Sequence, residues 1–254
     1  MRRVVITGLG IVSSLGLDAK ATWRGMLAGE TGVGPLKILD LPAEPVQIAA
    51  QVQLPPDAPR ERRSNRSEQF GLLALEDALA QAQPDLESGD PRRRGVFQGA
   101  ATAGLPVAED YLLDQMAGRK GHAAEPIYQN SCNLTDAFGQ RLGAMGPRST
   151  IMNACSSSLL AIGQAWEQVA CGDLDLAVAG GAEALCRMTF GGFSSLKAMD
   201  TNPCRPFSRD RAGLNLGEGA VQLVLEPLTL AKARGAQILA EVLGYGASMD
   251  AHHP

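Results

Sequence analysis

The sequence of 254 residues is poor in aromatic side chains, in long apolar runs and in paired cysteines. Aromatic residues make up only 4% of the chain and the formal net charge is −4, which argues against a base-stacking surface or a basic field for nucleic acid. No stretch approaches the roughly 18 uninterrupted apolar residues that a transmembrane helix needs. We therefore expect a globular protein that has neither nucleic acid nor a membrane as its partner.

The five cysteines are scattered, and no pair has the C-x-x-C or zinc-type spacing. An odd number of separated thiols is typical of a reducing compartment, so we expect a cytoplasmic protein. The chain also lacks a P-loop, the G-x-S-x-G turn of serine hydrolases and the H-E-x-x-H metal motif. These absences predict no metal site and no cofactor.

Short apolar runs alternate with helical patterns along the whole chain. This alternation predicts an α/β fold, in which helices cover both faces of a mostly parallel sheet. The last two predicted strands, residues 221–226 and 238–245, are expected to pair with each other. The other predicted strands cover residues 4–7, 95–101, 148–154 and 174–179, and the main predicted helices cover residues 67–83, 106–116, 134–142, 155–169 and 229–234.

A glycine-rich segment, from Gly8 to Gly10, follows the first predicted strand and resembles part of the G-x-G-x-x-G fingerprint of dinucleotide-binding folds. The third glycine is missing, and no helix opens directly after the segment. We interpret it as a tight structural turn, with nucleotide binding as the less favoured alternative.

Two groups of arginines stand out in this acidic chain. Arg60, Arg62, Arg63 and Arg66 precede or begin the helix predicted near residue 67, and they indicate either an anionic partner or a solvated loop. The run of three arginines at residues 92–94 is interpreted as a solvated loop.

Cys155 is the sharpest candidate for chemistry, in the segment Met-Asn-Ala-Cys-Ser-Ser-Ser at residues 152–158. It lies between a predicted strand and the first turn of a predicted helix, where unpaired amides and the helix dipole stabilise a thiolate. The same amides are suited to bind the oxyanion of an acyl thioester under attack. The alternative from this pattern alone is an inert buried cysteine, and the other four cysteines have no comparable setting.

Several motifs in the same order resemble the N-terminal half of an elongating β-ketoacyl-acyl-carrier-protein synthase, a condensing enzyme of the thiolase fold. The resemblance implies that residues 1–254 form the nucleophile-bearing domain, one half of an αβαβα sandwich. The motifs are RVVITGLG at residues 3–10, NACSS at 153–157, AGGAE at 179–183, RPFSRDRAG at 205–213, GEGA at 217–220 and AKARGA at 231–236.

The resemblance implies that Cys155 accepts an acyl group from a carrier-protein thioester. Enzymes of this family then decarboxylate a malonyl thioester, and the resulting carbanion attacks the acyl-cysteine in fatty-acid or polyketide synthesis. Arg62, Arg63 and Arg66 correspond to basic residues that contact the acidic acyl carrier protein in similar enzymes.

The acyl pocket is implied by three further positions. Thr102 falls where the family has a residue that gates the pocket, and Phe193 is expected near it. Phe190 is bulkier than the residue of many relatives, which implies a shorter acyl chain.

The family also needs two histidines and a lysine from a C-terminal half, and this chain ends at Pro254 before those motifs. We therefore expect a complementary chain or half to supply them, in a homo- or heterodimer with the strand at residues 148–154 as the dimer edge. The helix at residues 155–169 is apolar on nearly every face, so an isolated half would expose part of it. Two alternatives stay open, namely a non-catalytic partner subunit that shapes the pocket or docks carrier protein, and a cysteine acyltransferase without decarboxylation.

Overall fold

The computed structural model describes residues 1–55, 65–121, 129–249 and 251, and its centre is a six-stranded sheet in the order β5-β4-β6-β7-β1-β8. The strands are β1 (Val4–Val12), β4 (Arg94–Gly99), β5 (Arg148–Ile151), β6 (Leu176–Glu183), β7 (Gly219–Pro227) and β8 (Ala240–Val242). A second, two-stranded sheet pairs β2 (Val33–Pro35) with β3 (Ile48–Ala50). The helices are α1 (Ala19–Leu27), α2 (Arg66–Ala82), α3 (Leu105–Met116), α4 (Asn133–Arg141), α5 (Ser157–Cys171), α6 (Arg187–Ser195) and α7 (Leu228–Ala233).

The large sheet has a parallel half and an antiparallel half. β4 pairs in parallel with both β5 and β6, whereas β7 is antiparallel to its neighbours β6 and β1. The directions of β5, β4, β6 and β1 therefore agree, and only β7 and β8 run the other way. The α/β class is confirmed, but the expected pairing of the last two strands is wrong, because β1 lies between β7 and β8.

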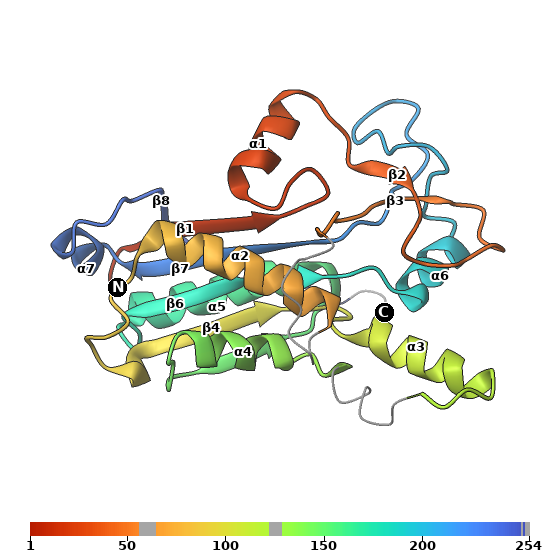
Figure 1. The fold of residues 1–254 in the computed structure, drawn as a ribbon. Helices are drawn as coiled ribbons and strands as arrows, with labels where there is room; N and C mark the ends of the chain where they lie inside the picture. The colour runs from red at the N-terminus through yellow and green to blue at the C-terminus, as the bar shows by residue number, and fades with distance from the viewer. Residues whose placement is uncertain (56–64, 122–128, 250, 252–254) are drawn as a thin grey trace.

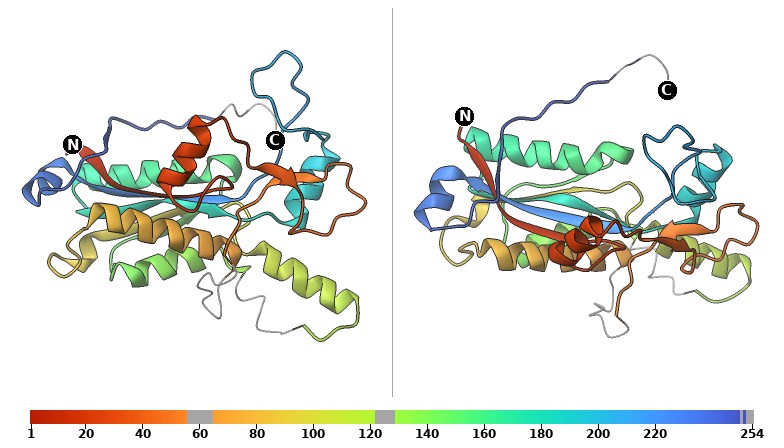
Figure 2. Two further views of the ribbon diagram at one scale, coloured as in Figure 1. Left: turned by 45° about the horizontal axis from the view of Figure 1, so that its top comes forward. Right: turned by 90° about the horizontal axis from the view of Figure 1, so that it is seen from above.

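Helices cover the sheet on both faces, as expected from the sequence. α2 and α4 lie on one face and α5 on the other, so that the sheet is the middle layer (Figure 1; Figure 2). Phe70 and Phe138 are fully buried in the core under α2 and α4. Phe97 of β4 and Ala165 of α5 belong to the separate core on the opposite face.

The segment around Gly8 and Gly10 is not a turn, which corrects the sequence interpretation. β1 continues through both glycines to Val12 and pairs with β7 over most of its length. A Cβ at Gly10 would lie 1.8 Å from the carbonyl oxygen of Ala74, and one at Gly8 would lie 2.2 Å from that of Ala78. The glycines are therefore needed because the backbone of α2 packs directly on the strand, and α2 covers the place that a pyrophosphate would need.

The outer face of α5 is only partly covered. Trp166 donates its indole N–H to the carbonyl oxygen of Val242 at 3.1 Å, and the ring of Tyr245 lies against Gly163, so the segment after β8 crosses the helix (Figure 2). Near the start of α5, Leu159 keeps 68% of its surface exposed. This agrees with the expectation that a helix apolar on most faces is left partly uncovered here. In the described parts of the chain, no helix combines the length and hydropathy of a membrane span.

Candidate active site

Cys155 lies in a short 3-10 turn, Ala154–Ser156, between the end of β5 and the start of α5. The residue is exposed, so the inert buried cysteine of the alternative interpretation does not apply. Ala154 has a φ of +45°, a left-handed conformation that costs energy for a residue with a Cβ. The chain therefore changes direction sharply just before the sulfur.

Side chains on both sides of Cys155 fix this turn. The Ser157 hydroxyl accepts the backbone N–H of Asn153 at 2.8 Å and donates to the carbonyl oxygen of Ala154, also at 2.8 Å. The Asn153 side chain donates to the Ser156 hydroxyl at 2.8 Å. The row of serines after the cysteine thus supplies the hydrogen bonds that satisfy a strained strand-to-helix junction.

Two glycines allow the first turn of α5 to lie directly on the ends of the parallel strands. A Cβ at Gly99, the last residue of β4, would be 2.3 Å from the backbone nitrogen of Ser158. A Cβ at Gly181 of β6 would be 2.2 Å from the Ser158 hydroxyl. Cys155 therefore lies at the carboxyl edge of β5, β4 and β6, the edge at which ligands bind in open α/β sheets.

Thr102 lies at the same edge, in the loop that follows β4. The carboxylate of Glu183, the last residue of β6, accepts hydrogen bonds from the backbone N–H groups of Ala101, Thr102 and Ala103 and from the Thr102 hydroxyl. The first and third of these bonds are 2.6 and 2.7 Å long. Sequence reasoning missed Glu183; its only signal was its place at the end of the AGGAE motif.

Phe190 and Phe193 both belong to α6, which follows β6 beyond this edge. Phe190 is fully buried in a small core with Leu39 and Val46, whereas Phe193 is half-buried. The prediction that Phe190 limits acyl chain length stays a prediction, as does the place of Phe193 near the pocket.

Arg66 is the first residue of α2, and its guanidinium binds acceptors within the same chain. It donates two bonds of 2.7 Å to the carboxylate of Glu218, whose side chain is fully buried, and one of 2.8 Å to the carbonyl oxygen of Val52. Glu218 also accepts the backbone N–H groups of Val52 and Leu185. Through Glu218, Arg66 thus joins α2 to the segments that contain Val52 and Leu185. The contact of Arg66 with a carrier protein stays a prediction. Arg62 and Arg63 lie outside the described residues.

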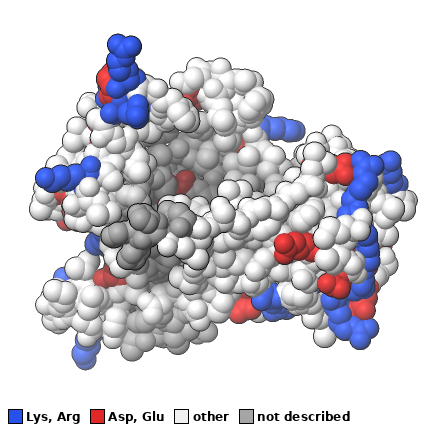
Figure 3. Space-filling view, turned by 180° about the vertical axis from the view of Figure 1, so that it is seen from behind, with Lys and Arg blue, Asp and Glu red and all other residues white. Residues whose placement is uncertain are grey.

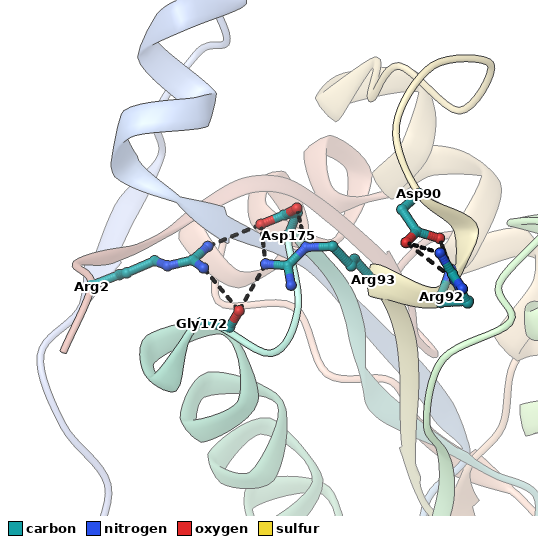
Figure 4. Close-up of polar contacts among 6 residues, drawn as sticks. All are labelled: Arg2, Asp90, Arg92, Arg93, Gly172 and Asp175. Carbon is teal, nitrogen blue, oxygen red and sulfur yellow. Dashed lines mark hydrogen bonds and ion pairs between the residues drawn. The ribbon is translucent and has the colours of Figure 1, made fainter.

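The far end of α5 is held by two arginines (Figure 4). Arg2 and Arg93 both donate to the carboxylate of Asp175, and both also donate to the carbonyl oxygen of Gly172, which ends the helix in the left-handed conformation. Cations are favourable at the carboxyl end of a helix. The hydrogen bonds from Arg93 are the main reason why the pKa of Asp175 lies below its ordinary value, and those from Arg2 add to the effect.

The interpretation of residues 92–94 as a solvated loop is therefore wrong for two of the three arginines. Arg93 binds Asp175, and Arg94 is buried with bonds to the carbonyl oxygens of Leu142 and Ser88. Only Arg92 pairs at the surface, with Asp90 (Figure 4).

The face that carries α5 differs in character from the rest of the molecule. Seen from this side, charged groups gather at the two ends, whereas the middle is largely uncharged and is hollowed towards the α6 end (Figure 3). Met152 and Leu159, on either side of Cys155 in the sequence, are 61% and 68% exposed. Exposed apolar side chains thus flank the exposed Cys155 in the sequence. Among the described residues, no cluster of His, Cys, Asp and Glu has the arrangement of a metal site.

Comparison with known proteins identifies the family. The family model of the β-ketoacyl synthase N-terminal domain matches residues 1–231. The chain belongs to the β-ketoacyl synthase family. It is 35% identical over 269 residues to 3-oxoacyl-[acyl-carrier-protein] synthase 2 of Staphylococcus aureus strain COL, and this match covers 99% of the chain but 64% of the relative. The chain thus spans slightly less than two thirds of that ketosynthase.

Solved ketosynthase structures share its fold. The ishigamide ketosynthase/chain length factor is 31% identical with a TM-score of 0.92, over 100% of this chain and 65% of the solved one. The AntDE:AntF complex, described as a type II polyketide synthase carrier protein with its ketosynthase bound to the hexaketide, is 29% identical with a TM-score of 0.86, over 99% of this chain and 64% of the solved one. These matches confirm the thiolase-like fold expected from the motifs.

Proposed function

We propose that this chain is the nucleophile-bearing part of a β-ketoacyl-acyl-carrier-protein synthase, in which Cys155 accepts the acyl group. The observation that carries the proposal is the exposed Cys155 just before α5, on a turn that serine side chains hold in a strained conformation. A nucleophile must be reachable and fixed, and an inert structural thiol needs neither property.

In the loading step, the Cys155 thiolate attacks the carbonyl carbon of the acyl-carrier thioester. The tetrahedral oxyanion collapses, the bond to the carrier sulfur breaks, and the carrier leaves as a thiol after taking up a proton. Backbone N–H groups at the amino end of a helix are suited to stabilise the negative oxygen. Because the first turn of α5 is packed on Gly99 and Gly181, the sulfur and these amides keep a fixed mutual position.

The condensation step makes a further chemical demand on the site. Loss of carbon dioxide from a malonyl thioester leaves a carbanion, which attacks the acyl-cysteine carbonyl and expels the Cys155 thiolate. Proton donors must stabilise the enolate in this step, and we propose that a complementary chain or C-terminal portion supplies them. The partly uncovered face of α5 is the natural surface for that portion, since its exposed residues near Cys155 are apolar.

We further propose an acyl carrier protein as the second partner, with Arg62 and Arg63 as contacts. The solved complex of a similar ketosynthase with its carrier protein supports this choice of partner. For the dimer, β5 is the proposed edge, because among the described residues it is the last strand on its side of the sheet.

A non-catalytic partner subunit is the second candidate, favoured by the likeness to a solved ketosynthase/chain length factor. The two candidates differ in whether the sulfur of Cys155 takes up an acyl group. Retention of an exposed cysteine on a strained turn favours the catalytic candidate, since a pocket-shaping subunit has no use for it.

Intact mass spectrometry of the assembled ketosynthase, after incubation with an acyl-carrier thioester, tests the proposal. We expect one acyl adduct on wild type and none on Cys155→Ala. Cys171→Ala is the matched control, because Cys171 is also exposed but lies at the other end of α5, and this variant should load normally. An unmodified wild-type chain with the complementary portion present would favour the non-catalytic subunit instead.

A further inference from the structure

The strongest unexplained arrangement beside Cys155 is the carboxylate of Glu183. It takes four donors from a single stretch of three residues: the N–H groups of Ala101, Thr102 and Ala103 and the hydroxyl of Thr102. Successive amides that converge on one anion form a concave binding site for negative charge, and bonds to a charged acceptor are stronger than neutral ones. Glu183 is therefore the fixed centre of the loop after β4.

The strand register explains why Glu183 reaches this loop. β4 and β6 are parallel neighbours, and Gly99 at the end of β4 is paired with Gly181. Two residues further along each chain are Ala101 and Glu183. β4 ends at Gly99, whereas β6 continues two residues further, to Glu183. The loop amides after Gly99 therefore have no strand partner on β6, and the Glu183 side chain accepts their hydrogen bonds instead.

Other hydrogen bonds hold the two ends of the loop, and Glu183 holds its middle. The Ser67 hydroxyl donates to the carbonyl oxygen of Ala103 at 2.8 Å, which holds one end. Ala103 has a φ of +47°, a conformation that costs energy without compensating bonds. At the other end, the N–H of Ala100 donates to the carbonyl oxygen of Ile151 at 3.0 Å. Ile151 is the last residue of β5, the strand that leads to Cys155. The loop after β4 and the turn that carries Cys155 therefore begin at the ends of two neighbouring strands.

We infer that Glu183 is a positioning residue that sets the acyl-chain preference of Cys155 by holding Thr102 in one orientation. This inference rests on the proposed function. Because the Thr102 hydroxyl is turned to the carboxylate, the methyl group is the part of the side chain that remains for a substrate. Losing the carboxylate frees both the hydroxyl and the loop backbone, and the boundary of the acyl site then becomes variable.

The first arm of the test measures the loop itself. In Glu183→Gln, the side-chain NH₂ is a donor that must face backbone donors, so at least one amide loses its acceptor. We expect faster hydrogen exchange at Ala101, Thr102 and Ala103 in this variant, and intermediate rates in Glu183→Asp, which keeps the charge on a shorter side chain. Wild-type exchange rates at these amides in Glu183→Gln would overturn the positioning role.

The second arm measures selectivity in the assembled ketosynthase. The ratio of kcat/KM for long and short acyl-carrier thioesters should change about tenfold in Glu183→Gln, the size of a discrimination that rests on one boundary contact. Glu183→Asp should restore part of the wild-type ratio. Thr102→Val should shift the ratio in the same direction, and the double variant should shift it by less than the two single effects together.

Glu226→Gln is the matched control. Glu226 is a buried glutamate of the same sheet that also accepts a threonine hydroxyl, from Thr7, but it lies at the opposite edge, where β7 ends. It should lower stability and leave the acyl-chain ratio unchanged. If Glu183→Gln still forms the Cys155 adduct but its acyl-chain ratio is unchanged, the inference about Glu183 is overturned, whereas the proposed function is not. Absence of that adduct in wild type would instead refute the proposed function, and the exchange arm would still decide the positioning role.

Discussion

Replacement of Gly99 by alanine should displace the turn that carries Cys155. The new methyl carbon would lie 2.3 Å from the backbone nitrogen of Ser158 and 2.4 Å from the carbonyl carbon of Ser157, whereas ordinary contacts are about 3.5–4.0 Å. Both neighbours are backbone atoms at the start of α5 and cannot swing aside, so the helix end or the strand end must move by about 1 Å. Overpacking of this kind costs roughly 1–3 kcal/mol.

Thermal unfolding followed by circular dichroism measures the loss. In a chain of this length each kcal/mol lowers Tm by about 2–4 °C, so the expected decrease is about 2–12 °C. Because about 1 Å of misplacement can reduce a rate about a hundredfold, acyl loading on Cys155 should fall further than stability alone explains.

Gly192→Ala is the control for this substitution. A Cβ at Gly192, in α6, meets no atom within 4 Å, and alanine is a better helix former than glycine. It should therefore raise stability by about 0.5–1 kcal/mol. If Gly99→Ala unfolds at or above the wild-type temperature, α5 does not depend on close contact with the end of β4, and the reasoning is wrong.

Three further predictions concern charges and thiols. Glu218→Gln should destabilise the fold by about 3–5 kcal/mol in urea unfolding, because it leaves the Arg66 guanidinium without its buried partner, and the double variant Arg66→Met/Glu218→Gln should recover part of this loss. The pKa of Asp175 is lowered in the folded state, so the ionised carboxylate stabilises the fold at pH values above the ordinary carboxyl pKa, and this stabilisation is lost as the pH falls through the lowered pKa. Between pH 5 and pH 3, the Tm of wild type should therefore fall more steeply than that of Asp175→Asn. Iodoacetamide should alkylate Cys155 faster than Cys171, because the helix dipole stabilises negative charge at the amino end of α5 and opposes it at the carboxyl end; peptide mapping that finds equal rates would contradict this.

The sequence was most informative where local patterns decide structure. Asp18 caps α1 by accepting the N–H of Ala21, and Gly172 ends α5 in the left-handed conformation, so both residue types stand where their local preferences put them. The candidate Cys155 follows from the same kind of local reasoning, since a strand, a turn and a helix of small residues are readable in a single stretch.

Long-range packing was not readable from single stretches. The pattern around Gly8 is common to turns and to strands under a close helix, and only α2, nearly seventy residues further along the chain, distinguishes them. The pairing of β8 with β1 instead of β7 is a similar case. Arg93 was misread, Glu183 was missed and the internal ion pair of Arg66 was not foreseen, because a charged residue is recognised as partly buried only through its partner, and each partner lies many residues away.

The uncovered side of α5 has a further consequence for any thioester formed at Cys155. Met152 and Leu159 are exposed and lie three and four residues from Cys155 in the sequence, so we expect a partner that buries these two side chains to cover the reactive carbon as well. Assembly and protection from hydrolysis would then be one event, and an acyl group held on the chain before its partner arrives would be hydrolysed at the rate of an unshielded thioester.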